Sequence, residues 1–124
     1  MSLKRLIKSF TYAFKGLVKT WREEQNLQIH TVMAIITILI GFLFGLSSIE
    51  WLFLILCITL VVIMEVVNSA VERVTDILKP RIHGYVKEIK DIMAAAVLLA
   101  SISAVIVGLI IFGPKFYALL VALA

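Results

Sequence analysis

The chain has 124 residues, of which 62% are hydrophobic and 16% are charged. This composition excludes an ordinary soluble globular domain and is typical of a small integral membrane protein with one domain, residues 1–124. The formal net charge is +4. In so apolar a chain, a basic excess indicates contact with anionic lipid headgroups of a bilayer, and we expect no nucleic-acid partner.

The first predicted element is an amphipathic helix over about residues 3–23. Apolar residues recur at steps of three and four from Leu3 to Trp21, which is the period of a helix. The opposite side is basic, with Lys4, Arg5, Lys8, Lys15, Lys19 and Arg22. An aromatic-rich apolar face and a basic polar face are typical of a helix that lies in the membrane interface.

Three further helices are expected to cross the membrane, over about residues 29–46, 51–78 and 92–112. About 20 apolar residues cross roughly 30 Å of hydrocarbon, and a backbone in lipid has to satisfy its own N–H and C=O groups. Pro80 and Gly84 predict the break between the second and third spans. The predicted fold class is therefore an all-α integral membrane protein, with one surface helix and three transmembrane helices.

The basic residues also predict the orientation. Six precede the first span, none lies in the turn 47–50, and five separate the second and third spans: Arg73, Lys79, Arg81, Lys87 and Lys90. By the positive-inside rule, the N-terminus and segment 73–91 are expected in the cytoplasm, and the C-terminal tail after Pro114 outside.

A polar stripe in the second span carries the main functional signal. The segment EVVNSAVERVTD, residues 65–76, follows a run in which only Thr59 is polar. At about 100° per residue, its polar members fall within an arc of roughly 100°: Glu65, Asn68, Ser69, Glu72 and Asp76. Glu65 lies about 21 Å along the helix from Trp51, inside the inner leaflet, and the later acids emerge among headgroups.

An acid at the depth of Glu65 is costly unless it faces protein, so it predicts a functional site, with a structural ion pair as the alternative. Burial disfavours the charged carboxylate, which suits a base toward a hydroxyl arriving from the bilayer. Glu72, nearer water, suits a cation. Mg²⁺ takes one or two protein carboxylates together with phosphate oxygens, and Glu23 or Glu24 offers the second carboxylate.

The mouth of the third span adds two charges, Lys90 and Asp91, before a run of alanines. Lys90 suits a phosphate, and Asn68 suits a phosphate oxygen or a ligand carboxylate. Glycine-rich nucleotide loops, HExxH and a Ser/His/Asp set are not found in the sequence. The acids, the amide and the cation named above are the groups that phosphoryl transfer to a lipid alcohol would need. A small proton-coupled transporter that uses Glu65, or a structural membrane protein, remain the alternatives.

Three motifs together resemble the prokaryotic diacylglycerol kinase family of three-span membrane enzymes: FKGLVKTWREEQNLQIH, EVVNSAVERVTD and KDIMAAAVLLA. The resemblance covers nearly the whole chain. It implies a lipid kinase that uses ATP with Mg²⁺, and a homotrimer in which neighbouring subunits share the active sites.

The resemblance also implies roles for individual residues. Glu65 matches the proton acceptor, and Glu24 and Glu72 match the carboxylates that hold the metal on ATP. The polar residues around the phosphates match Asn68, Asp76, Lys90 and Asp91. The family's further nucleotide contacts correspond to Arg5, Tyr12 and His83. Its positions along the lipid correspond to Trp21, Trp51 and Ala94.

The acceptor within this family is either undecaprenol or diacylglycerol. The segments NLQIH, SIEW and GLIIFGPKF resemble the branch that phosphorylates undecaprenol to undecaprenyl phosphate. Both lipids present a primary hydroxyl at the interface, so the chemistry of the site does not separate them. The implied location is the inner (plasma) membrane of a bacterium.

Overall fold

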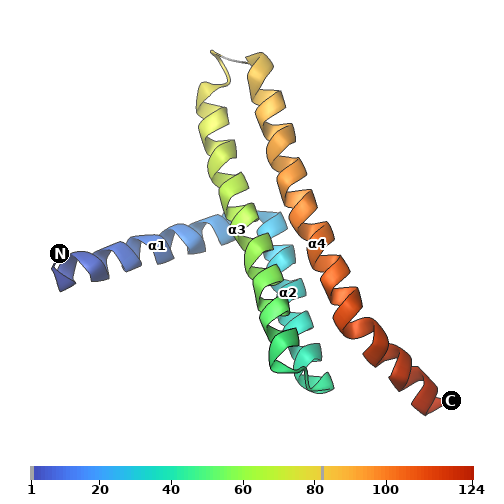
Figure 1. Ribbon diagram of the computed structural model, residues 1–124. Coiled ribbons are helices and arrows are strands. Elements are labelled where there is room, and N and C mark those ends of the chain that lie inside the picture. Colours follow the sequence, from blue (N-terminus) through green and yellow to red (C-terminus); the bar gives the residue numbers. More distant parts are fainter. Residues whose placement is uncertain (1, 82) are drawn as a thin grey trace.

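The computed structural model describes residues 2–81 and 83–124, and for His83 the backbone alone. These residues form four α-helices in an all-α fold: α1 (Leu3–Glu23), α2 (Gln25–Phe44), α3 (Ser48–Leu78) and α4 (His83–Leu123). Helix α1 projects crosswise from the other three, which run alongside one another (Figure 1). The described chain is thus a three-helix bundle with one lateral arm.

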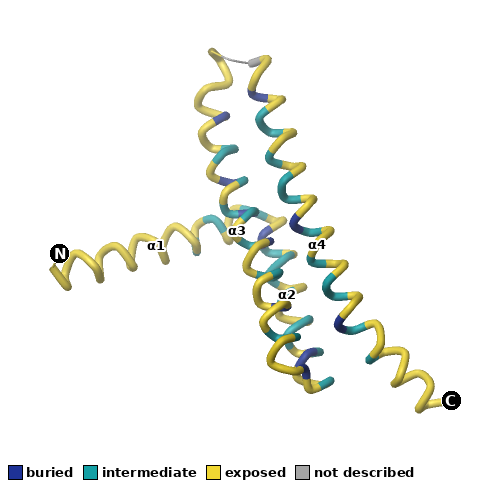
Figure 2. Tube along the Cα trace, in the orientation of Figure 1, coloured by how far each residue is buried: buried dark blue, intermediate teal, exposed yellow. Residues whose placement is uncertain are grey.

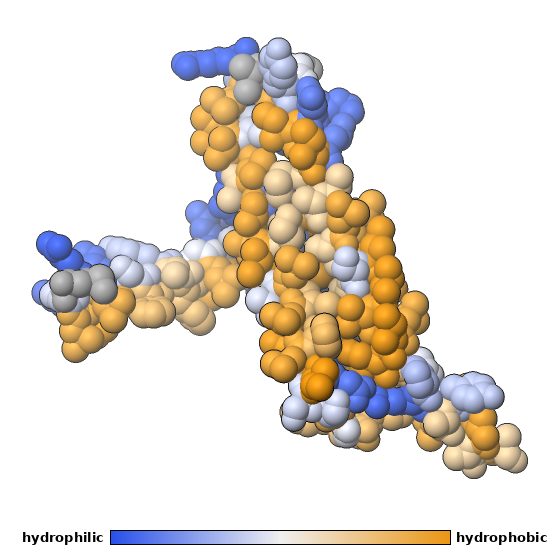
Figure 3. Space-filling model, viewed as in Figure 1, coloured by the Kyte–Doolittle hydropathy of each residue, from blue (hydrophilic) through white to orange (hydrophobic). Residues whose placement is uncertain are grey.

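Helix α1 begins at Leu3 and is capped by Ser2, whose side chain accepts a hydrogen bond from the backbone N–H of Arg5. All its residues are described and none is buried, so it is yellow over most of its length in Figure 2. Its apolar side chains gather on one side and its polar ones on the other (Figure 3). At its end, the side-chain amide of Gln28 donates to the carbonyls of Trp21 and Arg22, at 2.9 and 3.3 Å, and holds the turn into α2.

Helices α2, α3 and α4 are each long and apolar enough to cross a membrane. Helix α3 has 31 residues and is therefore about 46 Å long, whereas the hydrocarbon core is about 30 Å thick. The excess explains how one helix can be apolar over one part and polar over its last turns. An orange belt with polar surface at both of its ends is visible in Figure 3.

The turn between α2 and α3 is tightly capped. Gly45 ends α2 in the left-handed conformation, with φ +63°, which glycine adopts without steric cost. Ser47 and Glu50 then form a capping box at the start of α3. Lys115 of α4 lies 3.1 Å from Glu50 of α3 and joins α4 to α3 at this end of the bundle.

The apolar core of the bundle lies near the same end. Leu46, Leu54 and Ile111 are buried there, with Trp51 and Phe112 packed against them. Most other large apolar side chains are exposed in the single chain. They are available to lipid or to neighbouring subunits.

Helix α4 is longer than the predicted third span, residues 92–112. It starts at His83 and continues through Pro114 to Leu123, and it bends toward its C-terminal end (Figure 1). Proline has no N–H to donate within a helix, which bends the helix without always ending it. The ion pair between Lys115 and Glu50 falls directly after this proline.

Candidate active site

The polar stripe of α3 is turned toward the inside of the bundle. Side chains of Glu65 and Ser69 are only 5% and 2% exposed. A buried carboxylate or hydroxyl is costly without a hydrogen-bonding partner, and both of these groups have one on another element. The part of the stripe around Glu65 and Ser69 therefore lies in the interior of the bundle, whereas Asp76 at its end is 64% exposed.

The partner of Glu65 is on α2. Nε2 of His30 lies 3.1 Å from Oε1 of Glu65, which is hydrogen-bond distance. The His30 side chain is 30% exposed. This contact links a residue one turn into α2 with the deepest acid of the stripe.

The two carboxylates predicted to hold a metal are both fixed by α3. Ser69 Oγ donates to Oε1 of Glu24 at 3.0 Å, and Asn68 Nδ2 donates to Oε1 of Glu72 at 3.3 Å. Because Asn68 and Ser69 are adjacent in the chain, the two carboxylates are held from neighbouring positions of one helix. Of the two acids Glu23 and Glu24, it is Glu24 that contacts the stripe; Glu23 pairs with Arg73 at 2.7 Å.

A pocket of about 380 Å³ opens between α2, α3 and α4. Lys90 stands at its wall and donates to Oδ1 of Asp76 at 2.8 Å. The pocket combines two acids, two amides, an imidazole, a hydroxyl and a cation with apolar side chains. Its lining residues are Asn26, His30, Glu65, Asn68, Glu72, Lys90, Ala94, Val97, Leu98 and Ser101.

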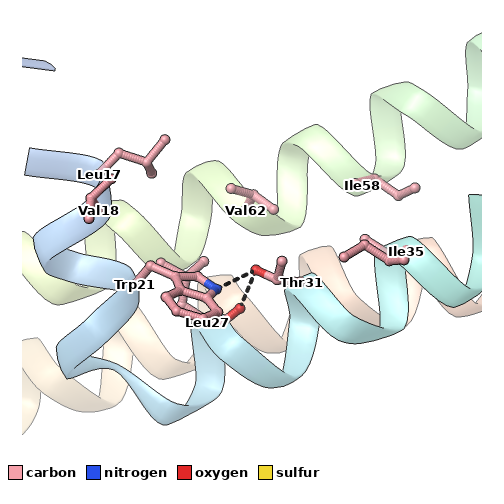
Figure 4. A pocket seen from close by; sticks show the side chains of 9 residues that line it. Leu17, Val18, Trp21, Leu27, Thr31, Ile35, Ile58 and Val62 are labelled. Atoms are coloured by element: carbon pink, nitrogen blue, oxygen red, sulfur yellow. Dashed lines mark hydrogen bonds between the residues drawn. The ribbon is translucent and has the colours of Figure 1, made fainter. Parts of the chain in front are cut away.

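A second pocket, of about 430 Å³, lies on the other side of α2 and is almost wholly apolar. Trp21 forms part of its wall, and Figure 4 shows the indole facing Thr31 across the junction of α1 and α2. Trp21 Nε1 donates to Thr31 Oγ1 at 3.2 Å, and this hydroxyl donates to the carbonyl of Leu27 at 2.7 Å. The pocket has room for a hydrocarbon chain beside the surface helix.

Other residues implied by the resemblance are not gathered at the 380 Å³ pocket in the single chain. Arg5 and Tyr12 lie exposed on α1, and Asp91 is paired with Lys87 at 2.7 Å. Trp51 stands at the far end of α3, against Phe42 with a ring separation of 4.8 Å. The side chain of His83 lies outside the described part of the protein.

Three polar residues of the pocket were not predicted as site residues: Asn26, His30 and Ser101. Asn26 and His30 are four positions apart at the start of α2, so they share one helix face. That spacing is a weak signal, and only the packing of α2 on α3 shows which way the face points. Ser101 lies, with Ser103, in a mainly apolar stretch of α4.

Among the described residues, no group of three or more His, Cys, Asp or Glu side chains is arranged to hold a metal ion. Two carboxylates fixed by Ser69 and Asn68 nevertheless fit an ion that arrives on a nucleotide, because Mg²⁺ needs only one or two protein carboxylates when phosphate oxygens complete its coordination. The residues therefore fit a nucleotide-borne cation better than a resident metal.

The fold and the pocket define a class: a small multi-pass helical membrane protein with an acid-lined polar pocket between three long helices. Residues 11–112 match the family described as prokaryotic diacylglycerol kinase. The chain belongs to this family, whose members are ATP-dependent lipid kinases, and it is an enzyme of that class.

Individual relatives carry two different names. The chain is 38% identical to undecaprenol kinase of Bacillus subtilis over 113 residues, which cover 91% of this chain and 92% of the relative. It is also 38% identical to diacylglycerol kinase of Synechocystis over 117 residues, 94% of this chain and 67% of the relative. Diacylglycerol kinase of Escherichia coli K12 is 34% identical over 112 residues, 90% of this chain and 92% of the relative.

Proposed function

We propose that the protein transfers the γ-phosphate of ATP to the primary hydroxyl of undecaprenol and forms undecaprenyl phosphate. The reaction type is inferred mainly from the position of Glu65. Its carboxylate is only 5% exposed and lies in the wall of a pocket that is also lined by Asn68, Glu72 and Lys90. A buried base beside phosphate-binding groups is what transfer to a lipid alcohol needs.

Support for undecaprenol comes from the relative in Bacillus subtilis, which matches this chain over more than nine-tenths of both lengths. Diacylglycerol is the second candidate, since relatives named diacylglycerol kinase reach 38% and 34% identity. Both lipids would present the same hydroxyl to Glu65. The difference between them lies in the hydrocarbon, which the apolar surroundings of the pocket would contact.

In the proposed reaction, Glu65 accepts the proton of the lipid hydroxyl as that oxygen bonds to the γ-phosphorus. The bond from this phosphorus to the oxygen of the leaving ADP breaks at the same centre. Protonated Glu65 then returns its proton to water. Removal of the proton makes the oxygen a better nucleophile.

The charged residues around Glu65 divide the task of holding the nucleotide. Glu24 and Glu72 would hold Mg²⁺, and the ion would neutralise phosphate charge. Lys90 would contact a phosphate oxygen and Asn68 would donate to another, since cations and amide donors stabilise the charge of the transferring group. Asp76 keeps Lys90 in place through its 2.8 Å hydrogen bond. Asp91 would lie at the edge of the same phosphate site.

The remaining contacts are proposed to come from the surface helix and the lipid-facing walls. Arg5, Tyr12 and His83 would contact the nucleotide, and Trp21, Trp51 and Ala94 the lipid. Helix α1 projects away from its own bundle (Figure 1), which leaves Arg5 and Tyr12 far along the arm. A homotrimer in which α1 of one subunit lies beside the pocket of another would bring them into use, and it would cover much of the exposed apolar surface.

We place the protein in the bacterial plasma membrane, with the N-terminus and the active site in the cytoplasm and the C-terminus outside. The basic residues of α1 and of segment 73–90 support this orientation. ATP would then reach the polar end of α3 directly. The whole chain, residues 1–124, would act as a single domain of one surface helix and three spans.

The experiment that tests this function uses the purified full chain in detergent or vesicles, with labelled ATP and Mg²⁺. Undecaprenol and diacylglycerol are supplied separately, at equal mole fractions. We expect the label to enter the organic phase with either lipid. The transfer should be faster with undecaprenol than with diacylglycerol. A higher kcat/KM for diacylglycerol would reassign the acceptor. Substrate movement across sealed vesicles without ATP would instead favour a transporter.

A further inference from the structure

The proposed reaction uses one oxygen of the Glu65 carboxylate and leaves its contact on α2 without a role. Oε1 of Glu65 lies 3.1 Å from Nε2 of His30. Among the described residues, His30 is the one basic side chain that lies within ion-pair distance of this carboxylate. Both residues line the 380 Å³ pocket. A contact between the buried acid and an imidazole at the pocket wall therefore needs an explanation.

We propose that His30 is a positioning residue for Glu65. Its Nε2–H donates to Oε1, which holds the carboxylate in one orientation and directs Oε2 to the pocket, where the lipid hydroxyl arrives. This role rests on the proposed function, because it concerns the geometry of the base in that reaction.

A free glutamate carboxylate would not keep this orientation by itself. Rotation about the last side-chain torsion of glutamate is broad, without the narrow wells of other torsions. In a pocket of about 380 Å³ the group has space to turn. Misplacement of a reacting group by about 1 Å can lower a rate by about 100-fold. A hydrogen bond to one oxygen removes this freedom.

Two polar residues of the pocket, Asn68 and Lys90, and the neighbouring Ser69 have other partners. Asn68 donates to Glu72, and Lys90 donates to Asp76. Ser69 is directed to Glu24. The imidazole of His30 is therefore the group that orients Glu65, and it does so from a different helix, so the orientation depends on how α2 packs against α3.

The test compares His30→Ala with His30→Gln in the lipid phosphorylation assay at saturating ATP and lipid. We expect His30→Ala to lower kcat by about 10- to 100-fold and to change the KM for ATP by less than about twofold. The side-chain amide of Gln can still donate to Oε1, so His30→Gln should recover about tenfold of this loss. Val32→Ala, at a position that is 53% exposed on the same helix, is the matched control and should keep the wild-type rate.

A merely structural contact would give a different result. If His30 only fastened α2 to α3, His30→Ala would melt at a lower temperature than the wild type, and its kcat would fall only in proportion to the folded fraction. Unchanged kcat in His30→Ala, or equal losses in the Ala and Gln variants, would overturn the positioning role. Absence of lipid phosphorylation by the unmodified protein would instead overturn the proposed function.

Discussion

The hydrogen bond between Ser69 and Glu24 shows how strongly the proposed nucleotide site depends on one buried hydroxyl. Ser69 is 2% exposed and its Oγ lies 3.0 Å from Oε1 of Glu24. A hydrogen bond to a charged group contributes about 1.5–3 kcal/mol. Since each 1.36 kcal/mol is a factor of ten, Ser69→Ala should lower kcat/KM for ATP with Mg²⁺ by about 10- to 150-fold.

The assay is the transfer of labelled phosphate to lipid, measured at several concentrations of ATP and Mg²⁺. Thr75→Val is the matched control: Thr75 is also 2% exposed on α3, but its hydroxyl donates to the backbone carbonyl of Glu72 and reaches no second helix. The control should stay within about threefold of the wild type. An equally small change in Ser69→Ala would refute the claim that this hydroxyl positions Glu24.

Three further predictions concern stability, nucleotide binding and the metal. A Cβ on Gly41 would lie 2.8 Å from the ring of Trp51, so Gly41→Ala should destabilise the protein by about 1–3 kcal/mol in thermal unfolding; Gly108→Ala, which meets nothing within 4 Å, should not. Lys90→Met should raise the KM for ATP about tenfold, whereas Lys79→Met, at an exposed side chain, should leave it unchanged. Chelation of divalent cations should stop lipid phosphorylation, and added Mg²⁺ should restore it; chelator-resistant turnover would contradict the role given to Glu24 and Glu72.

The helices could be predicted from the sequence because each depends on local chemistry. An apolar run longer than about 20 residues has few alternatives to a helix in lipid, and the period of the first helix is clear from Leu3 to Trp21. The C-terminal extension was not predicted, since Pro114 indicates an end. The helix nevertheless continues to Leu123, and Lys115 directly after the proline pairs with Glu50, a residue far away in the chain.

The candidate site, too, could be predicted only in part from the sequence. Helical geometry alone places Glu65, Asn68 and Glu72 on one face, and the structure has all three at one pocket. The contacts that orient these groups could not be predicted, because His30 to Glu65 joins α2 to α3, and Ser69 to Glu24 joins α3 to the residue between α1 and α2. Such pairs depend on how α1, α2 and α3 pack. A helical period carries no information about that packing.

The central claim is that Glu65 is the base, and its most direct test is lipid phosphorylation by Glu65→Gln, with ATP binding and thermal unfolding measured on the same preparation. Glu50→Gln is the matched control, because it makes the same change at the other end of α3, where Gln can still complete the capping box. The proposed mechanism predicts that Glu65→Gln loses transfer by at least about 100-fold while it keeps fold and ATP binding, and that Glu50→Gln stays active. Wild-type turnover in Glu65→Gln would contradict it.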